Sequence, residues 1–210
     1  MTMARITQLV VGGQPAAWSS IGLTFRDGVC SLGDFQLRLD QTLPPGLHSW
    51  VIGECVGTGD IDGIPTTCDG VSPAQAFAPD SSILDVVGVD HVVVFTNDLE
   101  RTSREVARVT GEPLKRVRDA GNGVRQGFHR LGSVIVEIVE IVEQQRVERS
   151  SLWGFVLTVN NLDDVAAHMG PDVLSPPKDA VQPGRRIAAF RSGVGLGTAV
   201  ALITPEPPRQ

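Results

Sequence analysis

The feature that most constrains this chain is an internal repeat, in which one pattern of elements is written twice between residues 86 and 207. The segment 90–100 can be laid over 153–163, and both are apolar, β-branched runs followed by a helix start. Further along, 125–130 matches 186–191, and each follows a turn-forming glycine. Each half therefore predicts a strand, a helix and a meander of three short strands, which gives an α+β fold of repeated βαβββ modules.

Both predicted helices carry start signals at matching positions. Asn97 and Asn160 sit at the expected N-cap positions, where a side-chain oxygen accepts from free backbone N–H groups. Glu100 and Asp163 follow three residues later, in the spacing of a capping box. We therefore expect both helices to begin directly after these asparagines.

The chain before the repeat divides into two parts. Residues 1–52 predict a degenerate N-terminal module, in which the pair Asp27-Gly28 is a hairpin turn signal. Residues 53–85 are rich in Gly, Pro, Asp, Ser and Thr and predict a long loop or linker. The two modules of the repeat then cover residues 86–145 and 150–207.

Charge and hydropathy argue against nucleic-acid and membrane partners. The chain has 18 Lys and Arg against 24 Asp and Glu, a net charge of −6, and contains no Lys/Arg run. Such a chain is poorly suited to coating phosphate backbones. No apolar stretch approaches a membrane span, and the N-terminus has too short an apolar run for a signal peptide. A cytoplasmic protein is the expectation.

Two patterns that look like metal sites are interpreted as ordinary structure. The cysteines Cys30, Cys55 and Cys68 are odd in number and far apart, which indicates reduced thiols and lacks the usual zinc-ligand spacing. Asp60 and Asp62 lie in a Gly-Asp-Ile-Asp-Gly segment that lacks the regular ligand series of a calcium loop. We expect a solvated turn there.

Three short segments read VDHVVV at 89–94, NDL at 97–99 and VEIVE at 136–140. Together they resemble the vicinal oxygen chelate superfamily. That group includes glyoxalase I, bleomycin-resistance proteins, extradiol dioxygenases and methylmalonyl-CoA epimerase. Its members pair βαβββ modules so that curved, mixed sheets form a cup. The resemblance covers residues 86–207 and, faintly, 5–52. It implies a glyoxalase-like protein that binds a small organic ligand. It also implies that modules of two copies can pair, which would give a homodimer.

The resemblance also implies candidate metal ligands. In the metal-dependent members, a His on the first strand and a Glu on the last strand of a module bind the metal, and His91 and Glu137 are similar to those positions. Imidazole and carboxylate suit a divalent first-row metal, which can stabilise an enediolate or activate oxygen. Strand alternation puts Glu137 on an apolar face, so its carboxylate needs a partner. Glu140 and Glu143 compete if the register differs, and His48 is a further candidate ligand.

The second half departs from the metal-binding pattern. Gly154 stands where the His is expected and Leu202 where the Glu is expected. Because a catalytic metal usually takes about three protein ligands, the sequence leaves two alternatives open. Either His91 and Glu137 pair with each other or with water in a metal-free cup, or they hold a divalent metal in a lyase, isomerase or dioxygenase. An inert scaffold is a third alternative, so enzyme activity is left open.

Basic residues on the meander strands are candidate ligand contacts. Arg125, His129 and Arg186 are expected to line or rim the cups. Arginine can hold a carboxylate or phosphate by paired hydrogen bonds, although a solvated strand edge is the alternative for each residue. The glycine cluster at 193–197 predicts a hairpin rather than a nucleotide loop, because a strand follows it.

Overall fold

The computed structural model describes residues 3–69, 83–141 and 149–208. The strands are β1 (Arg5–Gly12), β2 (Val29–Leu32), β3 (Phe35–Asp40), β4 (Gly46–Gly53), β5 (Thr66–Asp69), β6 (Val86–Thr96), β7 (Arg116–Gly121), β8 (Val124–Leu131), β9 (Val134–Ile141), β10 (Ser151–Val159), β11 (Lys178–Asp179), β12 (Arg186–Ala189) and β13 (Ala199–Ile203). The helices are α1 (Pro15–Ser19), α2 (Leu99–Thr110) and α3 (Leu162–Met169), with a 3-10 turn η1 (Ser192–Val194). This is an α+β chain with mixed sheets, so the expected fold class is confirmed. Within the described ranges, no helix is long and apolar enough to cross a membrane.

The chain forms two compact units, each assembled from three separated stretches of sequence. Unit 1 consists of Met1–Val10, Leu47–Ala74 and His91–Gly154. Unit 2 consists of Val11–Gly46, Gln75–Asp90 and Phe155–Gln210. Strands β1, β4, β6 and β10 therefore each contribute residues to both units, and the units are described separately below.

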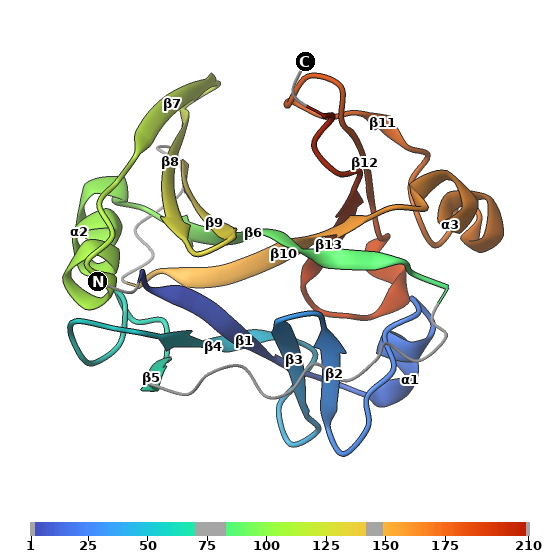
Figure 1. Ribbon diagram of the computed structural model, residues 1–210, viewed down its shortest axis with the longest axis horizontal. Helices are drawn as coiled ribbons and strands as arrows, with labels where there is room; N and C mark the ends of the chain where they lie inside the picture. Colours follow the sequence, from blue (N-terminus) through green and yellow to red (C-terminus); the bar gives the residue numbers. More distant parts are fainter. Residues whose placement is uncertain (1–2, 70–82, 142–148, 209–210) are drawn as a thin grey trace. The chain divides into compact units, whose positions relative to one another are not determined.

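Unit 1 holds the first copy of the repeat, as β6, α2, β7, β8 and β9 (Figure 1). The strand order is β10, β6, β9, β8, β7, in which β6 and β10 contribute residues 91–96 and 151–154. Strands β6 and β9 pair in parallel, whereas β9–β8 and β8–β7 are antiparallel. Helix α2 packs on one face of these strands (Figure 1). A Cβ atom at Gly127 would lie 3.1 Å from Leu99 Cδ2, so this glycine permits the close approach of helix and sheet.

Helix α2 begins one residue later than predicted. Its N-cap is Asp98, whose side chain accepts a hydrogen bond from the Arg101 backbone N–H at 2.8 Å. Asn97 instead accepts from the Arg101 guanidinium at 2.9 Å. A carboxylate next to the positive end of a helix is a stronger acceptor than an amide, which explains why Asp98 takes the cap. The helix ends at Gly111, in the left-handed region with φ of 75°.

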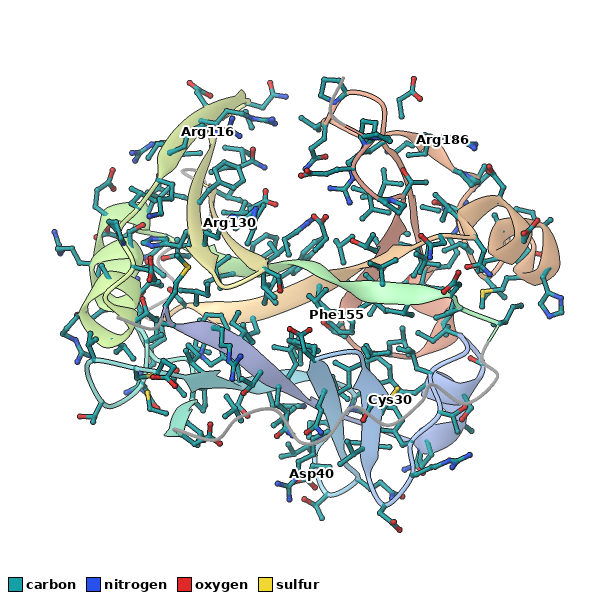
Figure 2. The ribbon with its side chains drawn as sticks, viewed as in Figure 1. Cys30, Asp40, Arg116, Arg130, Phe155 and Arg186 are labelled. Atoms are coloured by element: carbon teal, nitrogen blue, oxygen red, sulfur yellow. The ribbon has the colours of Figure 1, made fainter. Side chains whose placement is uncertain are left out.

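Unit 2 holds the second copy, as β10, α3, β11, β12 and β13, in the strand order β6, β10, β13, β12, β11. The N-cap of α3 is Asn161 rather than Asn160, again one residue later than predicted. The Asn161 side chain makes no cap bond, because it is engaged by the Asp85 backbone N–H and the Ile83 carbonyl, at 3.0 and 2.8 Å. Phe155, labelled in Figure 2, is buried in this unit.

The N-terminal region also follows the order strand, helix and three strands, from β1 to β4. Asp27 and Gly28 form a turn with positive φ angles, and the backbone groups of Arg26 and Val29 bond across it at 2.8 and 2.9 Å. The hairpin β2–β3 follows this turn and is itself joined at Gly33 and Asp34, so Asp27-Gly28 is not the hairpin turn that was predicted. The segment 53–85, expected to be a loop, contains strand β5, which pairs in parallel with β4. The prediction of a loop or linker over 53–85 is therefore corrected for residues 66–69.

The same ion pair recurs in both copies of the repeat. Arg125 pairs with Glu100 in unit 1, and Arg186 pairs with Asp163 in unit 2 with an Nη1–Oδ1 distance of 2.6 Å. Glu100 and Asp163 are thus held by arginines on a meander strand rather than in the predicted capping boxes. The alignment of Arg125 with Arg186 is confirmed by this pairing, which identifies the equivalent strand faces in the two copies.

Strand register corrects one part of the alignment. In unit 1, Arg125 lies opposite Glu140. In unit 2, Arg186 lies opposite Thr204, whose backbone N–H donates to the Arg186 carbonyl at 2.9 Å. Glu140 and Thr204 are therefore equivalent positions on β9 and just beyond β13.

Counting back three residues from these positions leads to Glu137 in unit 1 and Ala201 in unit 2. The expected match of Glu137 with Leu202 is wrong by one residue. Burial agrees with the corrected register, because Glu137 and Ala201 are both half-buried whereas Leu202 is fully buried. Apolar residues on both sides of Leu202 had left the register open.

Asp62 anchors the loop between β4 and β5 to helix α2 and is not the solvated turn residue expected. Its carboxylate accepts from Arg101 Nε at 2.8 Å and from the Thr102 and Ser150 hydroxyls at 2.5 Å each. Burial alone would raise the pKa of Asp62, but these three hydrogen bonds outweigh it and hold the pKa below its ordinary value. Asp60, by contrast, is exposed.

We expect Asp62→Asn to lower the free energy of unfolding by about 1–3 kcal/mol, because one amide cannot accept from all three donors. Asparagine tolerates the φ of 50° at this position, so the substitution tests the charge and its bonds rather than the backbone. Urea unfolding of this variant and of the exposed control Asp60→Asn measures the difference. Equal stabilities for the two variants would contradict the anchoring role.

Candidate functional site

The candidate site is the face of the unit 1 sheet that points away from α2, here called the His91 face. Its members are His91, Phe95, Gln126, Phe128, Glu137 and Trp153. Alternation along the strands separates them from Arg125, Gly127 and Glu140, which meet the side that α2 covers. These six side chains are half-buried or, for Trp153, exposed, whereas Val93 and Val139 on the same face are buried.

A polar cluster lies near the centre of the His91 face. The Val93–Glu137 register of the parallel pair β6–β9 makes His91 a diagonal neighbour of Glu137, and His91 Nε2 lies 3.7 Å from Glu137 Oε2. Gln126 Nε2 donates to Glu137 Oε1 at 2.6 Å. The side chains of His91 and Glu137 are 13% and 16% exposed, so the Glu137 carboxylate is largely withdrawn from water. Gln126 and His91 compensate the loss of hydration of this carboxylate.

Gln126 was not anticipated from the sequence. Its Nε2 is used by Glu137, but its Oε1 is buried and has no hydrogen-bond partner within the described residues. A buried amide oxygen without a partner is costly, so this atom is singled out among the side-chain atoms of the face. The available signal was its match with Ile187 in the second half, where the same position is apolar.

Aromatic side chains flank the polar cluster. Phe95 and Trp153 stack with ring centroids 4.9 Å apart and an interplanar angle of 24°, and Trp153 is 47% exposed. On the other side, the guanidinium of Arg116, labelled in Figure 2, lies 4.8 Å from the centroid of the Phe128 ring. The cluster therefore lies between an aromatic stack on one side and a phenyl ring that carries a guanidinium on the other.

The two arginines expected to bind ligand are engaged in ion pairs. Arg125 Nη1 donates to Glu140 at 2.9 Å and the same guanidinium pairs with Glu100. Arg186, labelled in Figure 2, pairs with Asp163. Arg125 lies on the α2 side of its sheet, so the structure does not bring it together with His91. Their ligand-binding role stays a prediction.

His129, the third expected ligand contact, lies on the α2 side as well. It is 1% exposed, its Nδ1 lies 3.1 Å from the Glu112 carbonyl, and its Nε2 has no partner within the described residues. Burial lowers the pKa of His129, the Glu112 hydrogen bond offsets this in part, and the charge of Lys115 adds to the lowering. Its binding role also stays a prediction, and its observed contacts are those of a core histidine.

The remaining metal-ligand candidates do not join His91 and Glu137. Glu140 accepts from the Leu99 backbone N–H at 3.1 Å on the opposite side of the sheet, so the register excludes it from the His91 face. His48 lies on β4, and Glu143 is outside the described residues. In the part of the chain that the structure describes, no three His, Cys, Asp or Glu side chains converge. Among the described residues, the donors near His91 and Glu137 are therefore fewer than the three protein ligands that a catalytic metal usually takes.

No protein-family model matches the chain, and no curated protein matches it. Among solved structures, methylmalonyl-CoA epimerase from Mycobacterium tuberculosis is similar over 60% of this chain and 92% of its own, at 16% identity and a TM-score of 0.49. A variant of the Streptomyces coelicolor epimerase bound to 2-nitronate-propionyl-CoA is similar over 58% and 99%, at 16% identity and a TM-score of 0.47. A hypothetical protein from Bacillus halodurans is similar over 58% and 96%, at 11% identity and a TM-score of 0.48.

These three structures share 11–16% identity with the chain, so its family and activity are argued from its own residues.

The buried, neutral His129 predicts a loss of stability in acid. Its folded-state pKa is lowered, so below about pH 6.5 the unfolded chain binds a proton that the folded chain resists, and stability falls as the pH drops from there toward the folded pKa. For one proton the slope is at most about 1.4 kcal/mol per pH unit. Urea unfolding across this range measures it.

We expect His129→Gln to remove this dependence, because glutamine does not titrate. The matched control is His168→Gln, at an exposed position of α3. The interpretation fails if the pH dependence of unfolding is the same in wild type and in His129→Gln.

Proposed function

We propose that the His91 face binds a small organic molecule and does so without a metal ion. The observation that carries this proposal is the state of Glu137. One of its oxygens accepts from Gln126 at 2.6 Å and the other faces His91 at 3.7 Å, so the chain itself compensates the half-buried carboxylate. A metal is not needed to account for a charge at this position.

The chemistry of the face indicates the kind of ligand. The half-exposed Phe95–Trp153 stack offers a flat apolar surface, which favours a planar or acyl group. The unpartnered Gln126 Oε1 favours a hydroxyl or N–H donor next to that group. A ligand combining these two features would fill both needs of the face. Small CoA esters are recorded with the methylmalonyl-CoA epimerase neighbours and provide a first probe. Homodimer formation stays a prediction.

A second candidate is a metal-dependent lyase, isomerase or dioxygenase that uses His91 and Glu137. The observation that favours it is again Gln126, because a half-turn of its amide would point an oxygen, in place of the nitrogen, toward Glu137. The Gln126 oxygen and the Glu137 carboxylate would then repel each other unless a cation lay between them. A bound divalent metal would supply Lewis-acid chemistry there. The two candidates therefore differ in which atom of Gln126 faces the carboxylate.

Trp153 makes ligand binding measurable. Trp18 and Trp50 are fully buried, so a change in tryptophan emission on ligand addition reports mainly on Trp153. We expect methylmalonyl-CoA, or a member of a panel of aromatic and acyl hydroxy acids, to produce a saturable change that a chelator does not abolish. Gln126→Ala should weaken binding about tenfold, the cost of roughly one hydrogen bond.

His91→Gln should weaken binding as well, whereas the matched control His168→Gln on α3 should leave it unchanged. Trp153→Phe keeps an aromatic ring but should remove the optical signal, with binding then followed by calorimetry. Absence of saturable binding across the panel would contradict the proposed function. Binding that requires added Mn²⁺, Co²⁺ or Ni²⁺ would favour the second candidate.

A further inference from the structure

Two of the three cysteines lie side by side in unit 1. Cys68 is the register partner of Ile52 in the parallel pair β4–β5. Cys55 lies three residues beyond Ile52, after Glu54 with its positive φ of 61° turns the chain. The Cys55 thiol donates to the Ile52 carbonyl at 3.3 Å, which holds its sulfur next to the residue that pairs with Cys68.

The two thiols interact directly and are accessible. Burial is the largest cause that raises the pKa of Cys55 to about 12, and a hydrogen bond and charge interaction with Cys68 and the charge of Asp69 contribute to the same rise. Both cysteines are half-buried, so a small oxidant can reach them. Cys30 is buried in unit 2 and provides an internal reference.

We propose that Cys55 and Cys68 are a modification site, at which a peroxide joins them in an intramolecular disulfide. In the first step the Cys68 thiolate attacks the peroxide O–O bond, forms a sulfenic acid and releases one hydroxide, which takes up the thiol proton as water. In the second step the Cys55 sulfur attacks the sulfenic sulfur, and its thiol proton leaves with the sulfenic hydroxyl as a second water. Two thiols and one hydrogen peroxide thus give one disulfide and two waters.

The bond would close the loop that docks on helix α2. Between the two cysteines, the Val56 and Gly57 backbone N–H groups donate to the Val109 carbonyl at 3.0 and 2.9 Å. Asp62 in the same loop holds Arg101 and Thr102, as described above. Strand β5 is short and lies at the edge of its sheet, paired with β4. A disulfide would tether this edge and reduce the freedom of the unfolded loop, so oxidation should raise the melting temperature.

The sequence allows a direct test by mass spectrometry. The reduced protein is treated with excess hydrogen peroxide, blocked with a thiol reagent and digested with a protease that cleaves before aspartate. Cleavage before Asp60 and Asp62 places Cys55 and Cys68 in separate peptides, 40–59 and 62–68. We expect these peptides to be recovered as one linked species that a reductant separates, and the melting temperature to fall on reduction.

Cys30→Ser should leave the linked species unchanged, whereas Cys55→Ser should abolish it while retaining the wild-type circular dichroism spectrum. Cys68→Ser gives the same test from the other side if Cys55→Ser fails to fold. Recovery of Cys55 and Cys68 only as sulfinic or sulfonic acids, or of links between two chains, would overturn the proposal.

Discussion

The buried carboxylate of Glu140 is the interaction on which the arrangement of unit 1 depends. It accepts from the Leu99 backbone N–H at the start of α2 and from Arg125 on the neighbouring strand, so it ties helix, β8 and β9 together. Since side chains alternate along a strand, fixing Glu140 toward the helix places Glu137, three residues earlier, on the opposite face. A slip of one residue would exchange the two carboxylates and leave one without partners. The hydrogen bond between Glu140 and the Leu99 N–H thus decides which of the two carboxylates lies on the His91 face.

The two copies of the repeat share their scaffold and differ in their chemistry. Both keep the arginine that binds an acidic residue in the first turn of the helix. The polar cluster of the first copy is absent from the second, where Gly154, Ile187 and Ala201 are the equivalents of His91, Gln126 and Glu137. The ion pair between helix and meander strand is therefore common to both copies, whereas the polar cluster belongs to the first copy.

The sequence predicted the repeat and the fold class, which follow from the order of the elements. It also predicted that the Glu137 carboxylate needs a partner, which follows from strand alternation. It missed positions that depend on a choice between adjacent residues of similar type. Asn97 and Asp98 are both good caps, so the helix start was off by one residue. Gln126 was missed because its partner lies on another strand, and Asp62 because its donors are distant in the sequence. Local patterns carry no information about such tertiary contacts.

The central claim is that the chain itself compensates Glu137, through Gln126 and His91, without a metal ion. The most direct test is elemental analysis for Mn, Fe, Co, Ni and Zn of protein purified without chelators and without a metal-affinity resin. The account predicts far less than one ion of any of these metals per chain, with no difference between wild type and His91→Ala. Close to one ion per chain in the wild type, lost in His91→Ala and in Glu137→Gln, would contradict it.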